Sequence, residues 1–184
     1  KMKIKIAILG TGHIARDLYR KINFDTNLEL FLVSGRNHLS EGSIEAKRFS
    51  KHVFSNGIDS IIERRKNIDV VIDCTSAEAH INHSKILNEL DLAVIDLTPS
   101  GIGKTIIPTI NLCDCNISKN INLVSCGGQS SIPILFKWSS ILKEKKIKLK
   151  YVEVASTIST KSAGLATRKN IDSYIKNTES AISS

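Results

Sequence analysis

Short apolar runs alternate with longer amphipathic stretches through most of the chain. The apolar runs have the length of strands, and each closes in turn-forming residues. The amphipathic stretches carry apolar residues at helical spacing. Strands that are apolar on both faces and alternate with helices indicate a mostly parallel sheet with helices on both faces, the α/β class. The expected strands lie in residues 4–9, 28–35, 68–76, 92–100 and 121–125, and helices are expected after Gly12 and over 41–51, 77–90 and 133–143.

The pattern changes in the last 40 or so residues. Residues 146–154, KIKLKYVEV, alternate lysine with apolar side chains, which predicts a strand with one wet face. A final helix places Ile171, Tyr174, Ile175 and Ile182 on one face. One such strand and helix cannot form a stable layer alone, so we expect the opening part of a second, α+β domain.

Composition narrows the class of protein. The 184 residues are 41% hydrophobic and 24% charged, as in a folded globular protein. The net charge is +8, but the lysines are scattered without interleaved aromatic residues, so we expect no nucleic-acid partner. The first apolar run is too short to span a membrane and lacks signal-peptide features. We therefore expect a cytoplasmic protein without a membrane partner.

A glycine-rich turn follows the first strand. GTGHIA supplies Gly10, Gly12 and Ala15, which fit the G-x-G-x-x-G/A fingerprint of a dinucleotide-binding, Rossmann-like fold. The second glycine lets the backbone approach a pyrophosphate at the helix N-terminus. Because the turn lies at the first strand of a βαβ pattern, we favour cofactor binding over a glycine turn that binds nothing.

The second strand ends without the acidic residue that would accept ribose hydroxyls. Arg36 and Asn37 stand there instead. Arg36 suits a 2′-phosphate or stacks on adenine, and a solvent-facing role is equally open. Asn37 can still bind a ribose. These residues leave the cofactor open between NAD and NADP. Thr75 and Ser76 after the third predicted strand are expected to line its crevice.

Cys126 follows the last apolar run and begins CGGQSSIP. We expect Ser130 or Ser131 to cap the following helix and Pro133 to stand in its first turn. A thiol near a helix N-terminus is stabilised as the thiolate nucleophile. Backbone N–H groups of Gly127 and Gly128 could face a developing oxyanion. The alternative is a small buried residue, which we adopt for the other cysteines, Cys74, Cys113 and Cys115.

Two further sets of residues could carry chemistry. His80 and His83 lie three apart on a predicted helix, but no third ligand is evident, so we predict no metal site and read them as surface or packing residues. Asp73 and Asp96 end predicted strands, where parallel sheets place ligands. A base is possible at either position, and capping of the next turn is the expected role.

These motifs together resemble the acylating acetaldehyde dehydrogenases that work beside 4-hydroxy-2-oxovalerate aldolase in meta-cleavage degradation of aromatics. The resemblance rests on IDCTSAEAH (72–80), IDLTPSGIG (95–103), CGGQSSIP (126–133) and STKSAGLATRKNID (159–172). It runs in order from Ile4 to the last residue and matches the N-terminal part of the family's length. It implies a dinucleotide-binding domain over 2–126 and part of a dimerisation and catalytic domain over 127–184.

The resemblance implies a reaction and its residues. Cys126 would attack a short aldehyde, hydride would pass to NAD, and coenzyme A would take the acyl group. The implied partners are the aldehyde, coenzyme A, the aldolase and a second copy of the chain in a homodimer. The implied cofactor residues are Thr11, Gly12, His13 and Ile14 in the turn and Ser162, Ala163, Gly164, Leu165, Ala166, Thr167, Arg168, Lys169 and Asn170 in a later loop.

This chain departs from the family at the cofactor. The family has Gly-Asn-Ile-Gly where this chain has residues 12–15, and Pro-Gly at Leu165 and Ala166. Loss of glycine limits backbone approach, which predicts weaker cofactor binding. Two other function classes compete: a semialdehyde or acyl-phosphate reductase that also uses a cysteine, and a non-catalytic cofactor-binding module.

Overall fold

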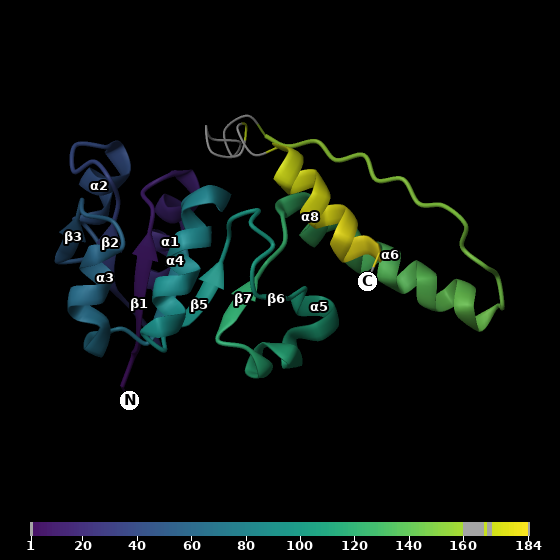
Figure 1. Cartoon of the computed structure of the whole chain (residues 1–184), viewed down its shortest axis with the longest axis horizontal. Helices are drawn as coiled ribbons and strands as arrows, with labels where there is room; N and C mark the ends of the chain where they lie inside the picture. Colours follow the sequence, from purple (N-terminus) through teal and green to yellow (C-terminus); the bar gives the residue numbers. More distant parts are fainter. Residues whose placement is uncertain (1, 160–167, 169–170, 184) are drawn as a thin grey trace.

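A parallel sheet forms the centre of the computed structural model, which describes residues 2–159, 168 and 171–183 (Figure 1). Its seven strands follow the order β3-β2-β1-β4-β5-β7-β6, and every neighbouring pair is parallel. The expected α/β class is therefore confirmed. The strands are β1 (Ile4–Leu9), β2 (Leu28–Ser34), β3 (His52–Phe54), β4 (Val70–Asp73), β5 (Ala93–Asp96), β6 (Lys104–Thr105) and β7 (Asn120–Asn122).

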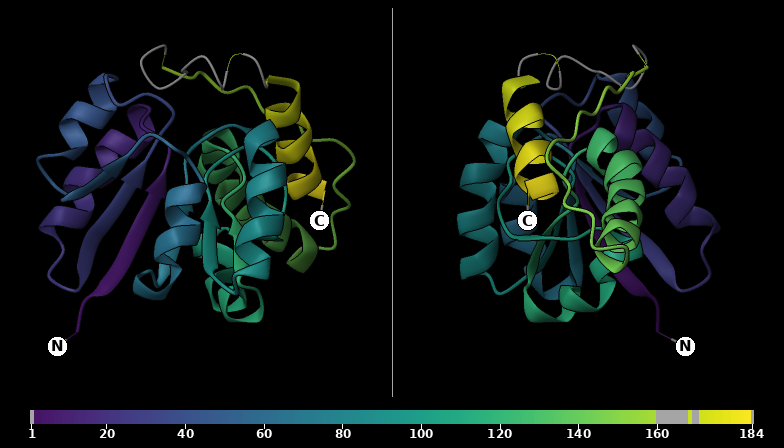
Figure 2. Two further views of the ribbon diagram at one scale, coloured as in Figure 1. Left: turned by 60° about the vertical axis from the view of Figure 1, so that its left-hand side comes forward. Right: turned by 90° about the vertical axis from the view of Figure 1, so that its right-hand side faces the viewer.

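Helices cover both faces of the sheet. Helices α1 and α2 supply residues to one apolar layer, and α3 and α4 supply residues to the other. The right-hand view of Figure 2 shows α1 and α4 on opposite sides of the strands. The helices are α1 (His13–Phe24), α2 (Glu41–Ala46), α3 (Asp59–Arg64), α4 (Ala77–Glu89), α5 (Pro108–Asn111), α6 (Cys126–Glu144) and α8 (Ile171–Ser183), with 3-10 turns η1 (Arg65–Asn67) and η2 (Leu112–Ile117).

The alternation of side chains along β1 explains why both faces are apolar. Ile8 is fully buried among residues of α1, including Tyr19, while Leu9 is buried on the opposite face with Leu87 of α4. Burying one such aliphatic side chain contributes about 1.5–3 kcal/mol. Both layers together fix the carboxyl edge of the sheet, where the loops after β1, β2, β4, β5 and β7 meet.

A smaller apolar cluster lies beyond β7. Ile107, Val124 and Ile132 are its buried members, and Ile110, Ala181 and Ile182 pack against them. This cluster joins α5, the end of β7, α6 and α8. Figure 1 shows α8 running alongside the first half of α6. The C-terminal helix therefore rests on the segment that carries Cys126.

The strand predicted over residues 146–154 is wrong. Residues 147–159 form neither helix nor strand, and Figure 1 shows them as a long trace returning from the far end of α6. Alternating polarity suits a strand, but a strand is stable only when another strand pairs with it. The described part of the chain supplies no such neighbour for this segment.

The predicted start of the helix after β7 is also wrong. Helix α6 begins at Cys126, and the hydroxyl of Ser125 caps it by accepting from Gly128 N–H at 3.0 Å. Ser130 and Ser131 instead donate to the carbonyl of Gly127, at 2.9 and 2.7 Å. Pro133 therefore lies inside the helix. Ser125 precedes Ser130 and Ser131 in the chain and can cap equally well, so the helix begins earlier than predicted. Its first turn then includes Gly127 and Gly128.

Candidate functional site

The glycine turn after β1 has the backbone that its sequence predicted. Gly10 has φ of 107°, and a Cβ there would lie 2.8 Å from the carbonyl oxygen of Cys74, so glycine is required. Around Gly12, by contrast, no described atom lies within 4 Å of a Cβ position. Gly12 is the N-cap of α1, and among the described residues no side chain caps that helix. The first N–H groups of α1 are therefore available to an anion.

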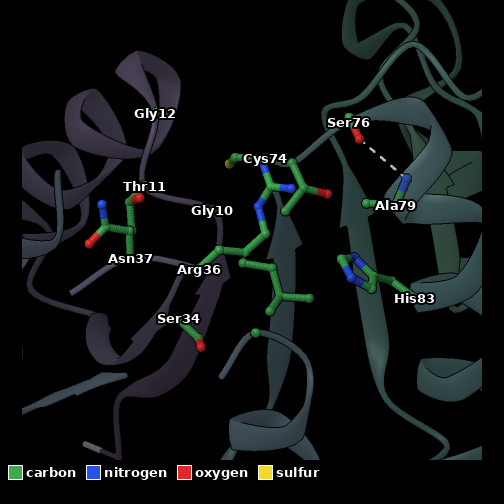
Figure 3. Close-up of a pocket in the computed structure, with 14 residues that line it drawn as sticks. Gly10, Thr11, Gly12, Ser34, Arg36, Asn37, Cys74, Ser76, Ala79 and His83 are labelled. Carbon is green, nitrogen blue, oxygen red and sulfur yellow. Dashed lines mark hydrogen bonds between the residues drawn. The ribbon is translucent and has the colours of Figure 1, made fainter. Parts of the chain in front are cut away.

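A cavity of about 360 Å³ opens over this turn, between the loops that follow β1, β2 and β4 (Figure 3). It lies where open parallel sheets bind their ligands. His13 and Ile14 enter α1 and are not among the described residues that line it. The predicted cofactor residues that do line it are Gly10, Thr11, Gly12, Arg36, Asn37, Thr75 and Ser76.

Arg36 and Asn37 play different parts at the cavity. Figure 3 shows the Arg36 side chain extending across the opening toward Cys74. Asn37 turns its side-chain oxygen back to the N–H of Leu39 at 2.9 Å, which forms a local turn before α2. A cation beside uncapped helix N–H groups suits a phosphate-bearing ligand, so the residues present fit a dinucleotide.

Helix α2 holds the glycine turn in place. A Cβ on Gly42 would lie 1.9 Å from the carbonyl oxygen of Thr11, so α2 touches the turn backbone directly. Arg16 of α1 joins Glu45 at 2.5 Å and Glu41 at 2.9 Å across the same contact. Contacts from α2 therefore hold the backbone of the turn in place.

A buried histidine connects the ends of β4 and β5. His80 is fully buried, and its Nδ1 lies 2.9 Å from Asp73 Oδ2. Its Nε2 lies 3.4 Å from Asp96 Oδ2 and makes no hydrogen bond to the described residues. His83, which lines the cavity, contacts the same Asp73 oxygen at 2.8 Å. His80 is buried, as expected of a packing residue. Its contacts with two carboxylates were not predicted, because the spacing of the histidines gave no sign of them.

The two carboxylates of this bridge differ in character. Burial alone would raise the pKa of Asp73, but hydrogen bonds from His80, His83 and Thr75 outweigh it and hold the pKa well below its usual range. Burial raises the pKa of Asp96. Each carboxylate also accepts the backbone N–H two residues on, from Thr75 at 2.9 Å and Thr98 at 2.7 Å, which confirms the predicted turn-capping role.

Asn122 extends this network to the cysteine turn. Its amide donates to Asp96 at 2.8 Å, and its side-chain oxygen accepts the N–H of Val124, also at 2.8 Å. Val124 has φ of 58°, a left-handed conformation that is costly for a β-branched residue. This sharp turn swings the chain from β7 directly into α6, and Cys126 is the first residue of that helix.

Cys126 is exposed at the start of α6, as the nucleophile reading requires. The two expected oxyanion donors are both engaged within the protein. Gly128 N–H bonds the capping hydroxyl, and Gly127 N–H donates to the hydroxyl of Tyr174 at 2.7 Å. That hydroxyl also lies 3.5 Å from the sulfur of Cys126. Tyr174 was expected only as part of an apolar helix face.

The other cysteines differ in their exposure to solvent. Cys74 lies at the cavity, and burial, aided by the charges of Asp73 and Asp96, raises its pKa far above the usual value, so it is a poor nucleophile. Cys113 is exposed, contrary to the expectation of burial, because it lies in the surface turn η2. The side chain of Cys115 is outside the described part of the structure.

The later predicted cofactor loop falls mostly outside the described residues. Ser162–Thr167, Lys169 and Asn170 lie outside the described residues, and Arg168 is exposed. Within the described ranges, no three His, Cys, Asp or Glu side chains gather as a metal site. The same ranges contain no helix with the length and apolar character needed to cross a bilayer.

Comparison with known proteins decides the relationship. The chain is 43% identical, over 98% of its length, to acetaldehyde dehydrogenase of Pectobacterium atrosepticum, and 39% identical to that of Geobacillus thermodenitrificans. The chain is related to acetaldehyde dehydrogenases. Residues 126–184 match the family model described as prokaryotic acetaldehyde dehydrogenase, dimerisation. The chain spans about 60% of the length of these curated relatives.

Solved structures support the fold of this acetaldehyde dehydrogenase relative. Aspartate semialdehyde dehydrogenase with NADP from Candida albicans has a TM-score of 0.55 at 15% identity, covering 78% of this chain and 48% of that one. GenD2 from gentamicin A biosynthesis, in complex with NAD, has a TM-score of 0.54 at 14% identity, covering 79% and 40%. At these identities the likeness concerns the fold alone.

Proposed function

We propose that this chain carries the cofactor site and the nucleophile of an acylating aldehyde dehydrogenase, which converts acetaldehyde or another short aldehyde, NAD and coenzyme A to acyl-CoA and NADH. The observation that carries the proposal is the exposed Cys126 at the start of α6, on the same sheet edge as the glycine-turn cavity. The relationship to acetaldehyde dehydrogenases supports the choice of substrate.

The chemistry would use Cys126 as a thiolate. Its sulfur would attack the aldehyde carbon, and the carbonyl oxygen would become the alkoxide of a thiohemiacetal. A bound nicotinamide supplies the acceptor for the hydride that leaves this carbon. The resulting acyl thioester on Cys126 would be attacked by the thiol of coenzyme A, which releases acyl-CoA and returns the cysteine. The position of Cys126 at the N-terminus of α6 favours the thiolate, both before it attacks the aldehyde and when it leaves the acyl group.

The cofactor is proposed to lie with its pyrophosphate at the N-terminus of α1. Gly12 leaves open space there, and the free N–H groups of α1 face it. Arg36 at the cavity rim is compatible with a 2′-phosphate, so NADP is the alternative to NAD. We further propose a homodimer, which the matched dimerisation model supports, and leave association with an aldolase and a cytoplasmic location as predictions.

A second candidate is a semialdehyde or acyl-phosphate reductase. It would use the same cysteine but release the acyl group to phosphate. The fold likeness to an NADP-bound aspartate semialdehyde dehydrogenase, together with Arg36, keeps it in consideration. Acyl-acceptor preference separates the two: coenzyme A supports one and inorganic phosphate the other. A non-catalytic cofactor-binding module would bind nucleotide and turn over with neither.

The test is an assay of the chain with acetaldehyde, coenzyme A and either NAD or NADP, followed by absorbance of the reduced cofactor. We expect reduction that depends on coenzyme A and is lost in Cys126→Ser. Cys113→Ser is the matched control, because Cys113 is also exposed but lies on a different turn. Cofactor reduction that needs inorganic phosphate in place of coenzyme A would favour the second candidate. Equal rates for Cys126→Ser and the wild type would refute the assignment of Cys126 as the nucleophile.

A further inference from the structure

One polar side of α8 contacts the turn that carries Cys126. Thr178 Oγ1 lies 2.7 Å from the Oγ of Ser125, the residue that caps α6. Asn177 donates to the side-chain oxygen of Asn122 at 3.4 Å. Tyr174 reaches Gly127 and Cys126 from the same side. Residues at spacing i, i+3 and i+4 lie on one helical face, so α8 is docked on this turn through hydrogen bonds.

The hydroxyl of Tyr174 sits between a donor and the sulfur. Its oxygen accepts the N–H of Gly127 at 2.7 Å and lies 3.5 Å from Cys126 Sγ, within hydrogen-bonding reach of sulfur. The phenol oxygen accepts from Gly127, so its own proton is available to the sulfur; the Ser125 hydroxyl is a further hydrogen-bonding neighbour of the phenol. A phenol has one donor and can also accept, so both contacts can form together.

Gly127 provides the space for this hydroxyl. A Cβ on Gly127 would lie 2.2 Å from the Tyr174 oxygen, so any side chain there would expel the phenol. The glycine was expected to serve an oxyanion, and its N–H is instead bonded to the tyrosine. The close approach of α8 to α6 therefore depends on the same glycine.

The phenol is a donor at neutral pH. Burial raises the pKa of Tyr174, and the neighbouring Cys126 raises it further, so the hydroxyl keeps its proton under conditions in which a cysteine can ionise. Hydrogen bonds to a charged acceptor are stronger than those between neutral groups. A protonated phenol beside the sulfur consequently favours the thiolate over the thiol.

We propose that Tyr174 is a catalytic residue of the proposed dehydrogenase: its hydroxyl donates a hydrogen bond to the sulfur of Cys126 and stabilises the thiolate, while Gly127 N–H fixes the direction of the phenol. The thiol proton leaves to solvent, and the phenol keeps its own. The role of Tyr174 in catalysis rests on the proposed function. Its effect on the ionisation of Cys126 does not, because the hydrogen bond is present without substrate.

The test measures thiol reactivity without turnover. The rate of alkylation of Cys126 by iodoacetamide would be followed from pH 5 to pH 10, with the modified site resolved by mass spectrometry. Tyr174→Phe removes only the hydroxyl. We expect the midpoint of the rate-against-pH curve to rise by about one unit and the rate at pH 7 to fall about fivefold to tenfold. Tyr151→Phe, at an exposed tyrosine, should leave the curve unchanged.

Two outcomes would overturn the proposal. An unchanged curve would show that the hydroxyl does not act on the sulfur, and a faster rate with an unchanged midpoint would show that Tyr174 merely covers it. Gly127→Ala, which displaces the phenol while retaining its ring, should shift the midpoint in the same direction as Tyr174→Phe, and circular dichroism would confirm that both variants fold. Alkylation needs no aldehyde or cofactor, so a wild-type protein without dehydrogenase activity would refute the proposed function separately.

Discussion

Gly12 and Gly42 both lie near the glycine turn after β1, but a side chain would enter open space at Gly12 and would collide with the backbone at Gly42. We expect Gly12→Ala to change the free energy of unfolding by less than about 0.5 kcal/mol, since its Cβ enters open space, and to weaken NADH binding because that space faces the pyrophosphate. Gly42→Ala should destabilise by about 1–3 kcal/mol, because its Cβ collides with the Thr11 carbonyl. Fluorescence titration with NADH and urea unfolding measure the two effects, and undiminished NADH binding by Gly12→Ala would contradict the assigned cofactor site.

Asp73 links stability to pH. Its pKa in the folded protein is lower than in the unfolded chain, so the carboxylate stabilises the fold above about pH 4, and this contribution is lost as the pH falls below that value. Asp73→Asn should lower the free energy of unfolding at pH 7 by about 3 kcal/mol, as for a broken buried pair, and the gap from wild type should narrow at pH 3.

Urea unfolding at several pH values checks this expectation. Asp17→Asn is the control, because Asp17 forms an exposed pair with Lys21 and should cost less than about 1 kcal/mol. A gap for Asp73→Asn that stays constant from pH 7 to pH 3 would contradict the assignment of its low pKa to the histidine contacts.

Single residues were predictable where their chemistry is local. The places of Gly10 and Gly12 in a turn after a strand, and of Cys126 at a strand-to-helix junction, followed from sequence neighbours alone; their roles in catalysis and cofactor binding stay predictions. His80 and Tyr174 were missed as functional contacts because each acquires its role from a partner distant in sequence: Asp96 for His80 and Gly127 for Tyr174. Helical spacing placed Tyr174 on an apolar face, but Tyr174 is only half-buried and Ile171 and Ile175 are exposed. The spacing could not show that the phenol hydroxyl lies beside a sulfur.

At the scale of elements, α6 depends on a cap that the sequence pattern did not favour. Ser125→Ala removes the acceptor for Gly128 N–H and the contact with Thr178, and we expect a loss of about 1 kcal/mol in the free energy of unfolding. Ser140→Ala, on the exposed side of the same helix, should cost less than about 0.5 kcal/mol. Equal losses for the two variants in thermal unfolding would contradict the assigned cap.

The main strands and helices followed from hydrophobic patterning, and the errors have physical causes. Strands β3 and β6 are only three and two residues long, too short for a recognisable period. Residues 146–154 show a strand period without a neighbouring strand in the described structure. Local patterning reports which faces of a segment could be buried, whereas pairing is decided by the rest of the fold.

At the scale of the whole molecule, helix α6 exposes several large apolar side chains. Ile134, Phe136 and Trp138 are 61%, 54% and 65% exposed. Such a surface is typical of an interaction site, which agrees with the proposed homodimer. We expect Trp138→Lys to weaken self-association at least tenfold in sedimentation velocity, whereas Phe24→Lys, at a more exposed aromatic residue on α1, should have no effect. A wild-type monomer at all concentrations tested would contradict this expectation.

The bridge from Asp73 through His80 and Asp96 to Asn122 also has a mechanical consequence. It crosses β4, β5 and β7 just below the edge where the glycine turn and the cysteine turn stand. A hinge between those strands would have to separate the buried carboxylate, imidazole and amide side chains from one another, which is costly. The cofactor cavity and Cys126 are therefore expected to move as one rigid body, so slow amide hydrogen exchange should extend without a break from β4 to β7.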